Sequence, residues 1–246
     1  MPHLLILKLE GPLVAFGDIM VDAIGPVSDL PSASMLTGLI ANALGWQRSD
    51  KAALQRLQDR LVHAARLDRS SGRFTEFQTA KLEKSDEGWT TRGRPEGRAG
   101  GDGSYLGPHL RYRDHDADVC VHVALALTPA DEAPTLEAIA AALIEPARPL
   151  FIGRKPCLPA ERIYFGLIEA ETLLDGLKAV PLEPSRQRVP PPVLVELPRD
   201  GQPPPDGFRL IHRSERRDWI AGAHTGDHLR WSGSLPRAAF AEKADR

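Results

Sequence analysis

Several features that mark particular protein classes are missing from this sequence of 246 residues. Cysteine occurs twice, at Cys120 and Cys157, which is too few for a secreted disulfide scaffold. We therefore expect two reduced thiols in a cytoplasmic protein. No apolar run approaches the roughly 18 residues that a membrane helix needs, so we expect no membrane partner. The apolar start over 4–7 lacks a basic flank and a cleavage site, which indicates a buried strand rather than a signal peptide.

Motifs for nucleotides, metals and acyl transfer are also missing. No Gly-x-x-x-x-Gly-Lys-Ser/Thr loop occurs, no Gly-x-Gly-x-x-Gly follows an expected strand, and no serine nucleophile elbow is present. His224 and His228 have the spacing of metal ligands, but Gly226 lies between them and no third ligand is nearby. We predict neither a cofactor nor a metal.

The composition is that of a globular protein. Hydrophobic residues make up 42% and charged residues 26% of the chain, enough for a core without disulfides or metals. A formal net charge of −2 excludes a protein that is basic throughout, but it does not exclude a local basic surface. Aromatic residues are scarce, at 6%, so few rings are available for stacking on bases.

Apolar periodicity predicts the order of elements in the first 170 residues. We expect a buried strand over 4–9, a helix that begins near Ser32 and ends at Gly45, and a second helix from Ser49 or Asp50. Further expected elements are strands over 62–67 and 74–80 around a hairpin-like turn at 70–72, a strand over 119–127, a helix after Pro134, and a strand over 163–168. This order predicts an α+β fold of the ferredoxin-like type, an antiparallel sheet with helices on one face.

The remaining residues differ in composition. Nine prolines fall within 181–205, which we interpret as too many for a central strand or a helix. We therefore divide the chain into a core over 1–170 and a second part over 171–246, a proline-rich segment with a small C-terminal subdomain.

A glycine-rich and basic excursion interrupts the core between 81 and about 113. Between Arg92 and Arg113 there are five arginines against Glu96 and Asp102, a net of +3. Tyr105 and Tyr112 are interleaved with them. Guanidinium groups bind phosphates and tyrosines stack on unpaired bases, so this segment favours nucleic-acid binding over a merely solvated loop.

Five local patterns in register resemble one known family. They are Leu5-x-Leu7-x-Leu9-x-Gly11-Pro12-Leu13-x-x-Phe16-Gly17, Pro31-Ser32-x-Ser34-x-x-x-Gly38-Leu39-Ile40-x-x-Ala43-Leu44-Gly45, Phe77-Gln78-Thr79, Arg113-x-x-x-x-Asp118-x-x-Val121-x-Val123-x-Leu125, and Pro149-Leu150-Phe151-Ile152-Gly153-Arg154-Lys155-Pro156-Cys157. Together, and with a weaker match at Arg216-x-Asp218-Trp219, they resemble the CasD family, the subunit that caps the 5′ end of the guide RNA in type I-E CRISPR Cascade complexes.

The resemblance implies an RRM-like core with a protruding thumb at about 81–112. It also implies a non-catalytic role in antiviral defence, in which the core binds the 5′ handle of crRNA and the thumb contacts the backbone subunit. The large subunit and, through the assembled complex, target DNA are the other implied partners. The expected RNA contacts are Ser32, Ser34, Gln78, Thr79, Lys81, Arg92, Arg94, Arg98, Arg111, Arg113, Arg154 and Lys155. Unpaired N–H groups in the first turn of the helix at Ser32 and Ser34 would suit a phosphate.

Two other functions remain open from the sequence. His109, His115 and His122, with Tyr105, Tyr112 and Lys81 nearby in sequence, could form a metal-independent endoribonuclease that processes pre-crRNA, as in type I-C relatives. Alternatively, the basic loop could bind an acidic partner protein in a pure adaptor.

Overall fold

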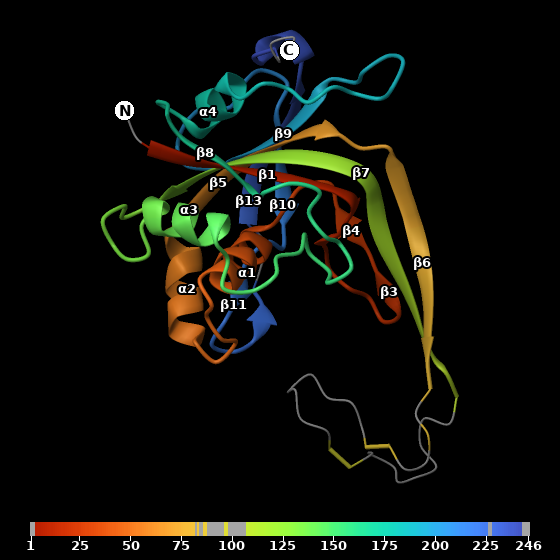
Figure 1. Ribbon diagram of the computed structural model, residues 1–246. Helices are drawn as coiled ribbons and strands as arrows, with labels where there is room; N and C mark the ends of the chain where they lie inside the picture. The colour runs from red at the N-terminus through yellow and green to blue at the C-terminus, as the bar shows by residue number, and fades with distance from the viewer. Residues whose placement is uncertain are drawn as a thin grey trace.

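A single large sheet organises the protein (Figure 1). The computed structural model describes residues 3–81, 83, 86–87, 96–97, 107–225 and 228–242. The strands are β1 (His3–Val14), β2 (Phe16–Gly17), β3 (Ile24–Gly25), β4 (Val27–Ser28), β5 (Leu61–Arg69), β6 (Gly72–Ala80), β7 (His109–Leu127), β8 (Tyr164–Glu169), β9 (Val193–Pro198), β10 (Arg209–Arg213), β11 (Arg217–Asp218), β12 (Ala223–His224) and β13 (His228–Leu235). The helices are α1 (Ala33–Ala43), α2 (Lys51–Arg60), α3 (Leu136–Ile144), α4 (Leu173–Ala179) and the 3-10 turn η1 (Arg237–Ala239).

The sheet has the order β10-β13-β9-β5-β7-β1-β8, with β3 and β6 also paired to β7. Apart from the short strands β2, β3 and β4, the chain order β1-α1-α2-β5-β6-β7-α3-β8 follows the sequence expectation. Strands β8, β1, β7 and β5 are antiparallel neighbours. The protein is thus a mixed α/β fold with a large antiparallel sheet and few helices.

Strand β1 is buried on both faces, as its continuous apolar run predicts. Leu5 and Leu7 belong to the core formed with α1 and α3, whereas Leu4 and Ile6 belong to a second core formed with α4. Figure 1 shows α1, α2 and α3 on one side of the sheet and α4 on the other. The expectation of helices on one face is therefore wrong for α4, because the apolar second face of β1 also needs a cover.

Helix α1 begins and ends where its sequence predicts. Ser32 is the N-cap, and its hydroxyl accepts a hydrogen bond from the Met35 N–H at 3.2 Å. Gly45 follows the helix with φ +80°, a conformation that glycine adopts without strain. The first helix of the chain is thereby placed with its N-terminus toward residues 214–219.

The predicted hairpin turn at 70–72 is wrong. Strands β5 and β6 run one after the other along the same side of β7. A register shift at Asp68 absorbs one extra residue, and the Ser71 N–H still donates to the Ala117 carbonyl at 2.9 Å. Asp118, at φ +49°, accepts hydrogen bonds from Arg69 and from the Ser71 hydroxyl. The chain therefore continues straight into β6.

The result is a long two-stranded ribbon, β6 with residues 109–117 of β7, which we call the arm. Figure 1 shows it curving away from the rest of the sheet. The sequence predicted β7 only from residue 119, where its strict apolar alternation begins. The strand starts ten residues earlier, at His109, because cross-strand pairing with β6 stabilises backbone that lacks the apolar alternation of residues 119–127.

The proline-rich segment contains a central strand, which corrects the interpretation that it could not. β9 lies between β5 and β13, and its residues Val193–Leu197 contain no proline. Val193 and Val195 are buried against α4. β9, β13 and β10 thus continue the sheet past β5, while the division of the chain at residue 170 stays a prediction. Within the described part of the chain, no helix is long and apolar enough to cross a membrane.

Candidate nucleic-acid interface

Two backbone amides in the first turn of α1 are already hydrogen-bonded within the chain. The Ser34 N–H donates to the Glu215 carbonyl at 2.9 Å, and the Met35 N–H donates to Ser32. The expectation that these amides are free for a phosphate is therefore wrong, because the C-terminal segment packs across them. The two serine hydroxyls lie 3.1 Å apart, and they are the polar groups that this turn presents.

Arg154 is held by backbone oxygens on two neighbouring strands. Its Nη1 donates to the Asp114 carbonyl at 2.6 Å and its Nη2 to the Gly25 carbonyl at 2.9 Å. Burial, followed by the nearby charge of Arg113, lowers the pKa of Arg154. The guanidinium thus ties its loop to β3 and to the base of the arm. Lys155, the next residue, is exposed.

Gly153 makes that loop possible. Its φ is +90°, and a Cβ there would lie 1.9 Å from the Ala15 carbonyl oxygen. Only glycine fits this close approach of two backbone segments. The loop is therefore fixed against the end of β1, with Arg154 directed to the carbonyls beyond it.

Ser32, Ser34 and Arg154 line the same pocket, which has a volume of about 750 Å³. Its remaining walls come from residues 15–20 and from 214–224. A second pocket of about 250 Å³ shares Ser34 and Gly153 with it and continues along α1 to Asn42. Three predicted contacts from two segments that are far apart in sequence thus line one groove.

The β11–β12 hairpin forms a wall of the larger pocket that the sequence analysis did not assign. Arg217, Trp219 and His224 line the pocket, and the Arg217 guanidinium lies over the Trp219 ring, 5.5 Å from its centroid. The short pattern Arg216-x-Asp218-Trp219 was the only signal for this wall. That pattern does not indicate that the hairpin lies next to α1.

Gln58 attaches this hairpin to α2. The buried Gln58 amide donates to the Arg217 carbonyl at 2.8 Å and accepts from the Arg217 N–H and from Trp219 Nε1, both at 3.1 Å. Gln55 accepts from the Trp219 N–H at 2.9 Å. The indole therefore has a fixed orientation before any ligand binds.

The arm carries four further predicted contacts, on different faces. Gln78 pairs with Arg111, and Arg113 lies two residues further along the same face. Thr79 lies on the opposite face, beside the Leu110 position. Arg113 also packs beside Gly25, next to the Arg154 guanidinium. Glu76 lies directly opposite Arg113 on this face, so the face carries two arginines and one carboxylate. Arg154 links this basic face of the arm to the pocket.

The other predicted contacts are less defined by the structure. Lys81 is exposed just beyond β6. Arg92, Arg94 and Arg98 lie outside the described residues, as does Tyr105.

The structure does not bring the three candidate catalytic histidines together. His109, His115 and His122 all lie on β7, six and seven residues apart, which corresponds to roughly 20 Å or more between neighbours at 3.4 Å per residue. The buried His115 ring stacks on Phe74 with the ring centroids 5.5 Å apart. His122 is fully buried among charged side chains.

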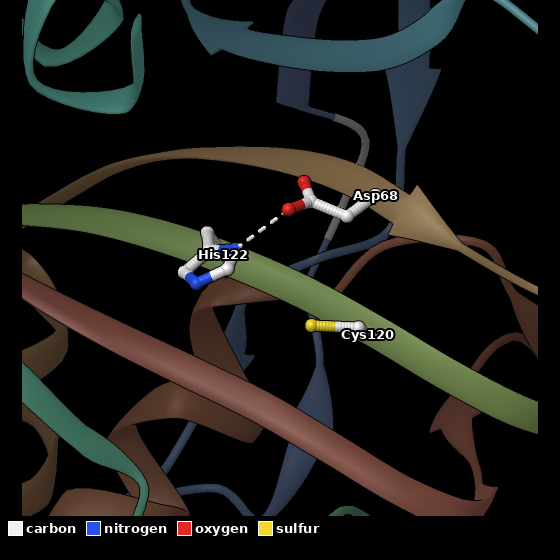
Figure 2. Close-up of side chains that lie close together, drawn as sticks. All are labelled: Asp68, Cys120 and His122. Carbon is white, nitrogen blue, oxygen red and sulfur yellow. Dashed lines mark hydrogen bonds and ion pairs between the residues drawn. The ribbon is translucent and has the colours of Figure 1, made fainter. Parts of the chain in front are cut away.

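Figure 2 shows the buried cluster around His122, in which Asp68, Cys120 and His122 lie close together. Asp68 accepts hydrogen bonds from Arg66 at 2.8 Å and 3.2 Å, from His122 Nδ1 at 3.0 Å, and from the Glu183 N–H at 3.0 Å. Burial raises the pKa of the Cys120 thiol. A carboxylate that already accepts four hydrogen bonds beside a guanidinium does not suit a metal, so we assign this cluster to the internal polar pairing of the sheet.

Comparisons with known proteins agree with this architecture. The model of the family described as "CRISPR-associated protein (Cas_Cas5)" matches residues 4–224. A curated relative from Escherichia coli (strain K12), "CRISPR system Cascade subunit CasD", is 27% identical over 169 residues, which cover 68% of this chain and 71% of the relative.

Solved structures share the fold. A chain of a "CRISPR RNA-guided surveillance complex" superimposes with a TM-score of 0.66 at 24% identity, covering 98% of this chain and 94% of that chain. A "Crystal structure of Cas protein" gives a TM-score of 0.62 at 23% identity, covering 98% and 100%. Because the family model spans most of the sequence, including the residues that build the pocket, this chain belongs to the CRISPR-associated Cas_Cas5 family.

Proposed function

We propose that this chain is a non-catalytic subunit of a type I-E CRISPR Cascade surveillance complex, in which it binds and caps the 5′ handle of crRNA in antiviral defence. The observation that carries the proposal is the family match over 4–224, together with a curated relative that is itself a Cascade subunit. The groove and the basic face of the arm supply a surface of the right chemistry for RNA.

In this proposal, β1, α1, β5, β7, α3 and β8 form a ferredoxin-like, RRM-like core. The antiparallel neighbours β8-β1-β7-β5 support this assignment. The arm and the residues beyond its two strands would be the thumb that contacts the backbone subunit. Phe77 and Tyr112, exposed on one face of the arm with ring centroids 5.3 Å apart, offer an apolar contact for a protein.

The RNA would lie along the other face of the arm and enter the groove beside α1. Gln78, Arg111 and Arg113 face the backbone phosphates in this arrangement, and Lys155 adds a cation at the edge of the loop. Thr79, Lys81, Arg92, Arg94 and Arg98 would contact RNA or partner nearer the tip. Arg154, being bound to two carbonyls, would act mainly by holding the groove in shape.

We propose no catalysis for this chain. Its three candidate histidines are spread along β7 instead of converging on one phosphodiester, and general acid–base cleavage needs two groups within reach of the same bond. The proposed partners are crRNA, the backbone subunit, the large subunit and, through the assembled complex, target DNA. We place this assembly in the cytoplasm.

Co-purification tests the proposal. Tagged chain is co-expressed with the other Cascade subunits and a CRISPR array, and the bound RNA and subunits are counted. We expect the wild type to recover crRNA, and the Arg111→Ala/Arg113→Ala double variant to recover less. An Arg199→Ala/Arg209→Ala variant, which removes two exposed charges elsewhere on the surface, is the matched control.

Two outcomes would contradict the proposal. Recovery of neither RNA nor subunits by the wild type would remove the binding role. Discrete cleavage of repeat RNA by the purified protein in the presence of a chelator would instead favour the endoribonuclease.

A further inference from the structure

We propose that the pocket between α1 and the β11–β12 hairpin holds one unstacked nucleotide of the bound single-stranded RNA, with its base against Trp219 and Arg217. The inference rests on the proposed function and deepens it, because it assigns a base-binding site to a segment near the C-terminal end of the family match.

The first argument is that the stacking surface is fixed in advance. Trp219 is half-buried, lines the pocket, and has its ring nitrogen bound to Gln58. Its neighbour Arg217 is held through its N–H and carbonyl to the same amide. Unpaired RNA bases stack on indole rings and on guanidinium planes. A side chain that is already oriented loses little conformational freedom when a base binds.

The second argument is the mixed chemistry of the walls. Ile19 and Met20 line the pocket from the β2–β3 connection and are 60% and 66% exposed, so they offer apolar contact on that side. The hydroxyl pair of Ser32 and Ser34 can bond to a ribose or a phosphate. Arg217 supplies positive charge.

The carboxylate in the lining, Asp18, has a hydrogen bond to each of its oxygens. Asp18 accepts hydrogen bonds from the Ser28 hydroxyl at 2.9 Å and from the Ile19 N–H at 2.8 Å. Its oxygens are therefore engaged in shaping the loop that carries Ile19 and Met20.

The third argument is the shape of the space. A volume of about 750 Å³ lies within the range that accommodates nucleotide-sized ligands. The smaller pocket continues from it past Met35 to Asn42. Arg154 lines the larger pocket and binds the base of the arm. A groove that continues along α1, and that is bordered by a residue bound to the arm, suits one nucleotide of a longer strand better than a free small molecule.

The test compares two RNA probes of equal length and charge, an oligouridylate and an oligomer with the same sugar-phosphate backbone but no bases. We expect the wild type to bind the oligouridylate more tightly. In Trp219→Ala the affinity for oligouridylate should fall about 5- to 100-fold, the range for the loss of one stacked base, while the affinity for the abasic probe stays unchanged. Tryptophan fluorescence should be quenched by oligouridylate in the wild type and in Trp231→Phe, but much less in Trp219→Phe.

A second pair of variants guards against misfolding of the Trp219 variant. Met20→Glu adds a charge at an exposed wall of the pocket. Ile220→Glu adds the same charge on the β11–β12 hairpin, at an exposed side chain that does not line the pocket. We expect at least fivefold weaker oligouridylate binding for Met20→Glu than for Ile220→Glu.

The outcomes separate the two levels of the proposal. Two results would overturn the nucleotide pocket and leave the proposed function standing. In the first, the wild type binds both probes with equal affinity. In the second, Met20→Glu and Ile220→Glu bind oligouridylate with equal affinity. Failure of the wild type to bind any RNA, alone or in the co-purified complex, would overturn the proposed function itself.

Discussion

Arg154 reaches across the molecule to Asp114, its Nη1 lying 2.6 Å from the carbonyl oxygen of that residue. The contact joins a loop that borders the pocket to the strand that forms the arm. The second hydrogen bond, to Gly25, places the same guanidinium against β3. One side chain thus fixes the relative positions of the two surfaces that the proposed RNA would contact.

The neighbouring residues Arg154 and Lys155 should therefore behave differently. Arg154→Met removes the hydrogen bonds that the guanidinium donates to two carbonyls, and we expect the free energy of unfolding to fall by about 2 kcal/mol. Lys155→Met should change it by less than about 0.5 kcal/mol, since the side chain is exposed. Urea unfolding of both variants makes the comparison. Equal stabilities of the two variants would show that the hydrogen bonds of Arg154 to Asp114 and Gly25 do not stabilise the fold.

Gly153 and Gly17 form a second matched pair, because both line the pocket. Gly153→Ala places a methyl group on the Ala15 backbone at positive φ, so we expect a loss of about 3 kcal/mol or more. No atom lies within 4 Å of a Cβ built at Gly17, and Gly17→Ala should be tolerated. Thermal unfolding measures both. A Gly153→Ala variant as stable as the wild type would mean that the loop can move away from β1.

The charges of the arm should appear in the salt dependence of RNA binding. Each phosphate contact on single-stranded nucleic acid contributes about 0.7 to the slope of log affinity against log salt concentration. If Arg111 and Arg113 each neutralise one phosphate, the double alanine variant should lower the slope by about 1.4. Fluorescence anisotropy at several salt concentrations measures it. An unchanged slope, with Arg199→Ala/Arg209→Ala as the reference, would place the RNA elsewhere.

His63 should make stability fall on mild acidification. Burial, and then the charge of Arg230, lowers the pKa of His63 well below 6.5. Its Nε2 has no hydrogen-bond partner, and the Glu215 carboxylate lies 3.8 Å away. Because the unfolded chain binds a proton near pH 6.5 and the folded chain does not, the free energy of unfolding falls as pH drops below about 6.5.

The matching measurement is urea unfolding of wild type and His63→Gln at pH 7, 6 and 5. Glutamine cannot take up the proton, so the variant should lose less stability over this range. The largest difference in slope is about 1.4 kcal/mol per pH unit for one proton. Arg213, Arg230, Glu196 and Glu215 are common to both proteins. Parallel profiles would show that His63 titrates alike in both states.

The sequence predicted those elements whose caps and apolar periodicity lie within the element itself. The hydroxyl cap at Ser32 and the stop at Gly45 define α1, and the apolar alternation over 119–127 defines the buried half of β7. The sequence did not predict β9, because the apolar run over 193–197 is short and has prolines on both sides. Its partners, β5 and β13, are remote in sequence. The turn expected at 70–72 failed for a similar reason, since pairing with β7 and the bulge at Asp68 keep the chain straight.

The same distinction between local sequence and long-range packing applies to the candidate site. By itself, the sequence determined which side chains could bind RNA, namely its arginines, its serine cap and the basic loop at 154–155, because residue type fixes charge and hydrogen-bonding capacity. Only the tertiary structure decided that Arg154 holds two strands together, that the Ser34 and Met35 amides are bound to Glu215 and Ser32, and that Trp219 lines the same pocket as the serine pair. Those outcomes depend on long-range packing, such as the hydrogen bond between Ser34 and Glu215, which no local pattern encodes.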